Sequence, residues 1–292
     1  MILLLACTSP DPPKASGDDT ATGEEIPTLA GCVVTGERTY FDSPGSSHWT
    51  ETWDEAARIV ATDEVTVYES GAAFHFASTH GFADDGCPDA WTSESQHAST
   101  DGDTIESFDT SQVGAATCDA HGAQDRREIA ESHVGTVDGE IVSEGESTRV
   151  ETVTNTWEDE LLVETVVVAD SGDSFRATMA YDADGRLVEQ QAFDPADAET
   201  PQWVWTATYV DGELDHHETV LATGEVGAFD YERDTTGRVV RRVYTLTDGD
   251  DVDVDVVTYF YEDGWTWSVG SEEDEDADGD VDETETVSYD CP

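Results

Sequence analysis

Two stretches of the chain decide its fold: "YDADGRLVE" at Tyr181–Glu189 and "YERDTTGRVVR" at Tyr231–Arg241. In each, an aromatic residue ends an extended segment and an acidic turn follows. A glycine then reverses the chain, and an arginine with aliphatic residues begins the next segment. Asp-Gly and Asp-x-Gly turns supply the positive φ that tight hairpins need, and flanking aromatic residues pair across strands. Each stretch therefore predicts an antiparallel β-hairpin.

Variants of this pattern recur along the chain. Neighbouring copies begin about 20 to 30 residues apart, which is enough for one hairpin each. Between them apolar and polar residues alternate, as at Trp203, Trp205 and Ala207, and this period of two is typical of strands with one covered face. The pattern predicts an all-β chain. The further copies are "WDEAARIV" at Trp53, "TVDGEIV" at Thr136, "WEDELLV" at Trp157, "YVDGELD" at Tyr209 and "YEDGWTW" at Tyr261.

The copy at Trp53 has two interpretations. Thr52 and Glu55 have the spacing of a capping box, which would begin a short helix. As a hairpin, the same stretch places Ala57 where the other copies have glycine, and a left-handed turn at alanine is strained. We favour the hairpin.

These hairpin sequences resemble the YD repeats of the RHS family, over roughly residues 118–292 and faintly over 31–117. In the large RHS proteins such repeats wind into a shell around a toxin. The copies here are too few to enclose anything, so the resemblance implies architecture and not toxin delivery. We expect an array of antiparallel β-hairpins that forms a twisted sheet or a partly closed sandwich.

The N-terminus, "MILLLACTSP", resembles the lipobox of a bacterial lipoprotein. The resemblance implies a thioether-linked lipid on Cys7, and Thr8 after it is associated with sorting to the outer membrane. Residues 1–7 then form a truncated signal, because six residues without a basic start precede Cys7 and a working signal is longer. We expect that the start codon has been assigned too late, and that the chain is lipid-anchored at the outer membrane or cell surface, facing the periplasm or the exterior.

Composition divides the remaining chain into two parts. Residues 8–30 are rich in Pro, Ser, Thr, Gly and acids, which predicts a flexible tether because such a segment buries too little apolar surface to fold. Residues 31–292 form the hairpin domain, with a sub-boundary near residue 117 as an option.

The other four cysteines form an even set with three pairings, and disulfides suit an oxidising compartment. Our first choice joins Cys87 to Cys118 across a modest loop. This leaves Cys32 with Cys291, a pair that would bring the two ends of the domain together and curl the sheet. The alternative is a chance apolar start with all the thiols free.

Charge restricts the partners. The chain has 68 acidic residues against 12 Lys and Arg, for a formal charge of −56. Such a surface repels nucleic acid and anionic lipid headgroups and attracts divalent cations. The simpler interpretation is solubility in a salty medium, where screening relieves the repulsion.

One acidic stretch, "DEDADGDVDETE" at residues 274–285, matches the ligand pattern of an EF-hand calcium loop, with Gly279 at the sharp turn. The flanks "WTWSVG" and "TETVSYD" are typical of strands, whereas an EF-hand has helices there. We therefore expect an acidic hairpin loop that accepts Ca²⁺ and is not a calcium switch; a chance match in an acidic chain is the alternative. The expected ligands are Asp274, Asp276, Asp278, Asp280 through its carbonyl, Asp282 and Glu285.

Motifs for catalysis are missing from the sequence, which has neither a Gly-x-Ser-x-Gly elbow nor a phosphate-binding glycine loop. We expect a non-enzymatic envelope lipoprotein with a structural or adhesive role, stabilised by calcium. The alternative is a carbohydrate-binding module or weak hydrolase that uses an aromatic sheet face; either a surface glycan or a protein would then be the partner. The candidate aromatic residues are Trp203, Trp205, Trp265 and Trp267.

Overall fold

The computed structural model describes residues 29–292 apart from 42–43, 84–85, 102–103, 195–196, 250 and 263–264. Every regular element in these residues is a β-strand, so the expected all-β class is confirmed. Cys7 and residues 8–28 of the expected tether lie outside the described residues, and Leu29 is buried. The strands are β1 (Val33–Tyr40), β2 (Gly45–Trp53), β3 (Ile59–Tyr68), β4 (Ala73–Phe82), β5 (Pro88–Asp101), β6 (Thr104–Cys118), β7 (Gln124–Val137), β8 (Glu140–Glu158), β9 (Leu161–Ala169), β10 (Ser174–Tyr181), β11 (Leu187–Asp194), β12 (Asp197–Val210), β13 (Glu213–Leu221), β14 (Val226–Arg233), β15 (Val239–Asp248), β16 (Asp251–Tyr261), β17 (Ser268–Asp274) and β18 (Glu283–Asp290).

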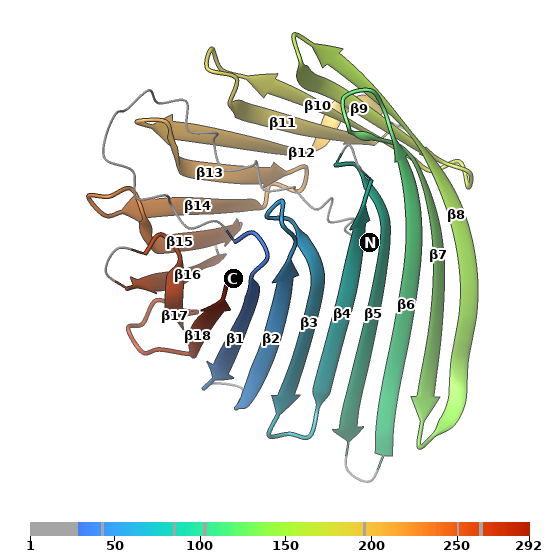
Figure 1. The fold of residues 1–292 in the computed structure, drawn as a ribbon, viewed down its shortest axis with the longest axis vertical. Coiled ribbons are helices and arrows are strands. Elements are labelled where there is room, and N and C mark those ends of the chain that lie inside the picture. Colours follow the sequence, from blue (N-terminus) through green and yellow to red (C-terminus); the bar gives the residue numbers. More distant parts are fainter. Residues whose placement is uncertain are drawn as a thin grey trace.

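The 18 strands form one closed ring, an up-and-down barrel (Figure 1). Each strand pairs antiparallel with its neighbours in the chain, and β1 also pairs with β18, with Val33 opposite Asp290 and Tyr40 opposite Glu283. The expected twisted sheet or partly closed sandwich is therefore corrected to a closed barrel. Closure gives the first and last strands a hydrogen-bonding partner that an open sheet would leave them without.

The two faces of the ring differ. The pairing registers place the buried strand residues on one face, with two exceptions: Phe193, which the Arg176 guanidinium covers, and Gly270, which has no side chain. Because the described residues include no layer outside the ring, the buried face points into it, and we call it the inner wall. Its buried residues include Val34, Ser47, Thr66, Ser78, Ile129, Glu151, Val153, Val167, Ala177, Ala192, Ala207, Val257 and Glu283.

At the end of the barrel that holds both Cys32 and Cys291, one arrangement of side chains recurs. We call the residues that form it the aromatic rim. The last inward-facing residue of each even-numbered strand lies there, and most of these residues are aromatic. Tyr hydroxyls of the rim donate to carbonyls of the preceding hairpin: Tyr181 to Leu162 at 2.9 Å and Tyr261 to Val239 at 2.7 Å. The rim residues are Trp53, Phe82, Cys118, Trp157, Tyr181, Tyr209, Arg233, Tyr261 and Tyr289.

The turns at this rim explain the opening motif. In the turn between β10 and β11, Asp182 Oδ1 accepts the Arg186 N–H at 3.0 Å, and Oδ2 pairs with the Arg186 guanidinium. Gly185 has a φ of 79°, which favours glycine. The guanidinium then lies 4.8 Å from the ring centre of Tyr209, two strands along the chain. This turn is therefore tied to the next hairpin.

The stretch at Trp53 forms the same turn and not a helix. Asp54 pairs with the Arg58 guanidinium at 2.7 Å, and that guanidinium lies 4.2 Å from the centre of the Phe82 ring. Ala57 takes a φ of 57° in the place of the glycine. The favoured hairpin is confirmed, at the cost of a left-handed alanine.

Two disulfides, Cys87–Cys118 and Cys32–Cys291, join the pairs that the sequence analysis favoured. Cys32 is fully buried in a small core with Leu29 and Val34, where the ends of the ring meet. Strands on both sides of residue 117 belong to the same barrel. Partly buried residues against this core are Trp49, Trp53, Trp267, Val287 and Tyr289.

Candidate functional site

The acidic loop lies between β17 and β18, at the opposite end of the barrel from the aromatic rim. Its closing residue is held from two directions: the Asp282 N–H donates to the Glu273 carbonyl at 2.8 Å, and its carbonyl accepts the Phe41 N–H at 2.7 Å. Gly279 has a φ of 99°, which fits the sharp turn expected there. The loop is thus anchored to the β1–β2 turn as well as to its own strands.

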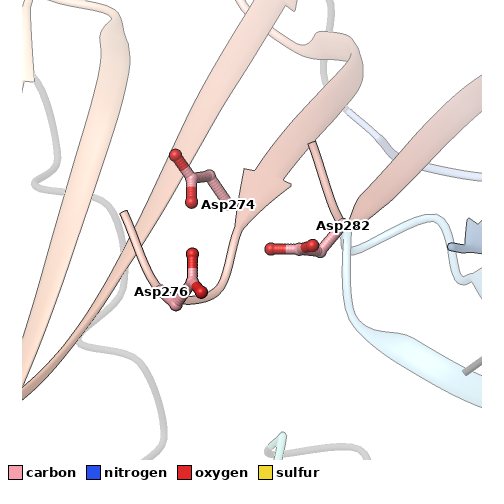
Figure 2. Close-up of side chains that lie close together, drawn as sticks. All are labelled: Asp274, Asp276 and Asp282. Carbon is pink, nitrogen blue, oxygen red and sulfur yellow. The ribbon is translucent and has the colours of Figure 1, made fainter. Parts of the chain in front are cut away.

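Three carboxylates of the loop converge. Asp274, Asp276 and Asp282 each offer an oxygen, and these oxygens lie within 4.8 Å of one another. Figure 2 shows the three side chains pointing toward a common space. Oxygens that share a Ca²⁺ ion at about 2.3–2.6 Å stand no more than roughly 5 Å apart, so this donor set fits a hard divalent cation.

Asp278 does not join this group of three, whereas the carbonyl of Asp280 stays a predicted ligand. The Asp278 N–H donates to carboxylate oxygens of Asp274 and Asp276, each at 3.1 Å. Asp278 Oδ1 in turn accepts the Asp280 N–H at 2.8 Å. Asp278 therefore shapes the loop rather than completes the cluster of carboxylates.

Glu285, expected as the twelfth ligand, lies on the inner wall. The alternation of β18 turns it inward, where its Oε1 accepts from Arg38 at 3.0 Å and from Trp49 Nε1 at 2.9 Å. The EF-hand pattern is wrong for this residue because the chain after the loop is a strand, whereas in an EF-hand a helix follows.

A second charged group surrounds Arg38 on the inner wall. Arg38 Nε lies 2.8 Å from Glu283, and Glu273 lies directly opposite Glu283 on β17. Burial, together with the charges of Glu273 and Glu285, outweighs Arg38 and raises the pKa of Glu283 to about 7. Burial lowers the pKa of Arg38, but Glu283 and Glu285 overcome this and raise it above its ordinary value. The group has three carboxyl groups, those of Glu273, Glu283 and Glu285, and Arg38 neutralises the charge of only one of them.

An aromatic row crosses the inner wall over four successive strands. Ring centres lie 5.7 Å apart for Trp205 and His217, 4.7 Å for His217 and Phe229, and 4.6 Å for Phe229 and Tyr244. Tyr244 lies opposite Asp255, so the row ends on a carboxylate. These rings are only partly buried, and they present a continuous stacking surface to the interior.

Two buried nitrogen atoms along this row have no hydrogen-bond partner among the described residues: His217 Nδ1 and Arg242 Nε. The Arg242 guanidinium lies 5.6 Å from the centre of the Phe229 ring. Burial, with the charges of His216 and Arg242, lowers the pKa of His217 and keeps its ring neutral. The row therefore combines a stacking surface with one guanidinium, that of Arg242.

The four expected tryptophans do not form one platform. Trp203 and Trp205 lie on the inner wall of β12, whereas Trp267 packs at the rim core and Trp265 lies 5.7 Å from the ring centre of Tyr289. His217, Phe229 and Tyr244 were missed because they come from three separate strands, and only the register aligns them.

Comparisons with known proteins give little more. No family model and no curated protein matches the chain. Among solved structures, a porin-like protein from Bacteroides uniformis ATCC 8492 is similar with a TM-score of 0.44 and 11% identity, over 91% of this chain and 99% of that one. No helix in the described part of the chain is long and apolar enough to cross a membrane.

Proposed function

We propose that the chain is a non-enzymatic, lipid-anchored envelope protein whose barrel stands in water and has a structural or adhesive role. The observation that carries this proposal is the distribution of residues between the two faces of the ring. A barrel that spans a membrane needs an apolar outer band with aromatic girdles and a polar interior. This barrel has its aromatic row and rim on the inner side.

The outer face of three adjoining strands illustrates the point. Across β2, β1 and β18 the outward residues other than Val33 are polar or charged, and lipid contact would leave their side chains without water. Such a surface favours attachment through a lipid on Cys7 over insertion of the strands. These outward residues are Ser46, His48, Thr50, Thr52, Thr35, Glu37, Thr39, Thr284, Thr286, Ser288 and Asp290.

The repeated rim supports a relationship to YD-type hairpins. The Asp-x-x-Gly-Arg turn and its aromatic partner recur at Asp182 and Asp234, where Arg238 lies 4.7 Å from the ring centre of Tyr261. This arrangement does not require a toxin cargo. A closed ring whose neighbouring hairpins are joined by guanidinium–ring contacts and disulfides suits a structural role. Calcium in the Asp274 cluster would add a further tie between β17 and β18.

The anchor and the role are tested separately. Protein expressed from its native gene is expected to incorporate labelled palmitate and to fractionate with the outer membrane, and Cys7→Ala is expected to abolish both. Absence of label in the parent protein would refute the anchor. For adhesion, beads carrying the protein are expected to bind cells or matrix above beads carrying a matched acidic protein.

The aromatic row favours a second candidate, the binding of carbohydrate to the inner wall. Sugars stack on aromatic rings, and this row offers Trp205, Phe229 and Tyr244 for stacking. A glycan array with one reproducible hit that Trp205→Ala and Tyr244→Ala remove, and that Trp265→Ala keeps, would favour this function. An array without hits at high protein density would reject it.

A further inference from the structure

The closed ring leaves one long strand edge open. Strand β8 has 19 residues, whereas its neighbour β9 has 9. Their pairing begins where Glu151 lies opposite Ala169, while β7 pairs with β8 from Glu140 onward. Figure 1 shows β8 running along β7 well past the end of β9. Among the described residues, Glu140–Arg149 therefore has a strand on one side only.

The direction of the open backbone groups follows from one hydrogen bond. The Val150 carbonyl accepts the Asp170 N–H at 2.9 Å, so the backbone groups of Val150 point to the β9 side. Since successive residues alternate in an antiparallel pair, the N–H and C=O groups of Glu144, Glu146 and Thr148 point to that same side. All three residues are exposed. The edge thus offers a regular row of donors and acceptors.

The charge and the size of the side chains along this edge determine which kind of strand can pair with it. Glu144 and Glu146 stand on the outer face, and the one basic residue of the stretch, Arg149, is paired with Glu151 at 3.0 Å. On the inner wall the edge carries the small residues Ser143, Gly145 and Ser147 ahead of Arg149, and these three leave room for the side chains of an added strand.

A second copy of the chain fits this edge poorly. Antiparallel self-pairing about Gly145 would place Glu144 opposite Glu146 of the other copy, and like charges directly opposite destabilise a strand pair. Two molecules that each carry a formal charge of −56 also repel one another at low salt. Opposite charges at the same positions contribute roughly 0.2–1 kcal/mol per pair.

We propose that the β8 edge binds an extended, basic polypeptide segment by strand addition, with Lys or Arg side chains opposite Glu144 and Glu146. Backbone hydrogen bonds supply the affinity, and the two carboxylates select the charge. This inference names the partner class for the adhesive role proposed above and rests on it for its biological meaning. Peptide binding tests the edge and cell binding tests adhesion, so either can fail without the other.

The test uses the full chain and a peptide of about ten residues in which Lys alternates with Val or Thr, with a Glu-for-Lys peptide as the comparison. Calorimetry measures affinity, and hydrogen exchange measures protection of the Glu144, Glu146 and Thr148 amides. We expect the Lys peptide to bind and to protect these amides, and the Glu peptide to do neither.

Three variants separate backbone from charge. Glu146→Pro removes an N–H group from the open edge of β8 and keeps the hydrogen bonds between β7 and β8. It is expected to weaken peptide binding more than tenfold. Its far-ultraviolet circular dichroism spectrum is expected to match that of the parent, which shows that the variant folds. The double variant Glu144→Gln with Glu146→Gln is expected to weaken it severalfold. Glu218→Gln, on the outer face of the doubly paired strand β13, is expected to change nothing.

Three results would overturn the proposal. The first is no binding at millimolar peptide. The second is equal binding by Glu146→Pro, which would mean attraction to acidic surface in general. The third is a dimer in high salt that Glu146→Pro abolishes, because the edge would then belong to a second copy of the chain.

Discussion

Cys87 and Cys118 form a disulfide at the two positions that an arginine and an aromatic ring occupy in other hairpins of the barrel. Cys87 directly follows the left-handed Gly86, as Arg186 follows Gly185, and Cys118 occupies the same rim position as Tyr209. The disulfide and the guanidinium–ring contact therefore have the same structural role. Each links one turn to the end of the next even-numbered strand.

This equivalence can be tested by exchange. Replacing both residues, Cys87→Ser with Cys118→Ser, is expected to lower the free energy of unfolding by about 3–4 kcal/mol, since the bond closes a loop with a sequence separation of 31. The double variant Cys87→Arg with Cys118→Tyr is expected to recover roughly 1 kcal/mol of that loss through the guanidinium–ring contact. Urea unfolding under oxidising conditions measures both. Equal stability of the two double variants would contradict the equivalence.

The strained turn at Ala57 predicts a stabilising substitution. Because Ala57 has a φ of 57° in a place where other rim turns have glycine, Ala57→Gly is expected to raise the free energy of unfolding by roughly 1 kcal/mol. The control is Ala56→Gly in the same turn, where φ is not positive and glycine is expected to destabilise. A lower melting temperature for Ala57→Gly than for the parent would show that the turn is not strained.

Calcium is expected to stabilise the barrel. With a dissociation constant of about 1 mM, 10 mM CaCl₂ would add about 1.4 kcal/mol to the free energy of unfolding, because the ion binds only the folded loop. Differential scanning calorimetry with Asp276→Asn and Asp282→Asn is expected to lose this effect. Glu285→Gln is expected to keep it, whereas an EF-hand would lose it. An unchanged melting temperature in the parent protein would remove calcium from the proposed function.

The charged group around Arg38 predicts a pH dependence of stability. The pKa of Glu283 is raised from 4.5 to about 7 in the folded chain, so the protonated carboxyl stabilises the fold below pH 4.5. That contribution is lost as the pH rises through 7. Glu283→Gln is expected to remove this loss between pH 4.5 and 7 in urea unfolding, relative to the parent.

The matched control for this titration is Glu37→Gln, on the outer face of β1, which is expected to keep the parent profile. If the parent and Glu283→Gln show the same slope over this window, the buried carboxyl does not titrate there.

Much of the local structure could be predicted from the sequence. The hairpins at Tyr181 and Tyr231 follow from acidic turns and glycines with positive φ, which act over a few residues. The turn at Trp53 was favoured on the same grounds although Ala57 replaces the glycine. Convergence of Asp274 and Asp276 also follows from a short loop, since residues two apart cannot separate far.

Non-local features could not be predicted in this way. Glu285 follows the acidic loop directly in the sequence, yet the strand after the loop carries it to Arg38 and Trp49. The row from Trp205 to Tyr244 exists only because three successive registers align single rings from separate strands. A shift of one residue in any of these pairings would turn a ring to the other face.

The sequence by itself determined the all-β class, the hairpin turns and the acidic character, because turn chemistry, strand periodicity and charge are properties of short segments. Only the tertiary structure decided that the hairpins close into a ring, which face is inner, and that the edge of β8 stays open. The physical reason is that closure depends on the pairing of β1 with β18 across almost the whole chain. Likewise, the open edge depends on the difference in length between two neighbouring strands.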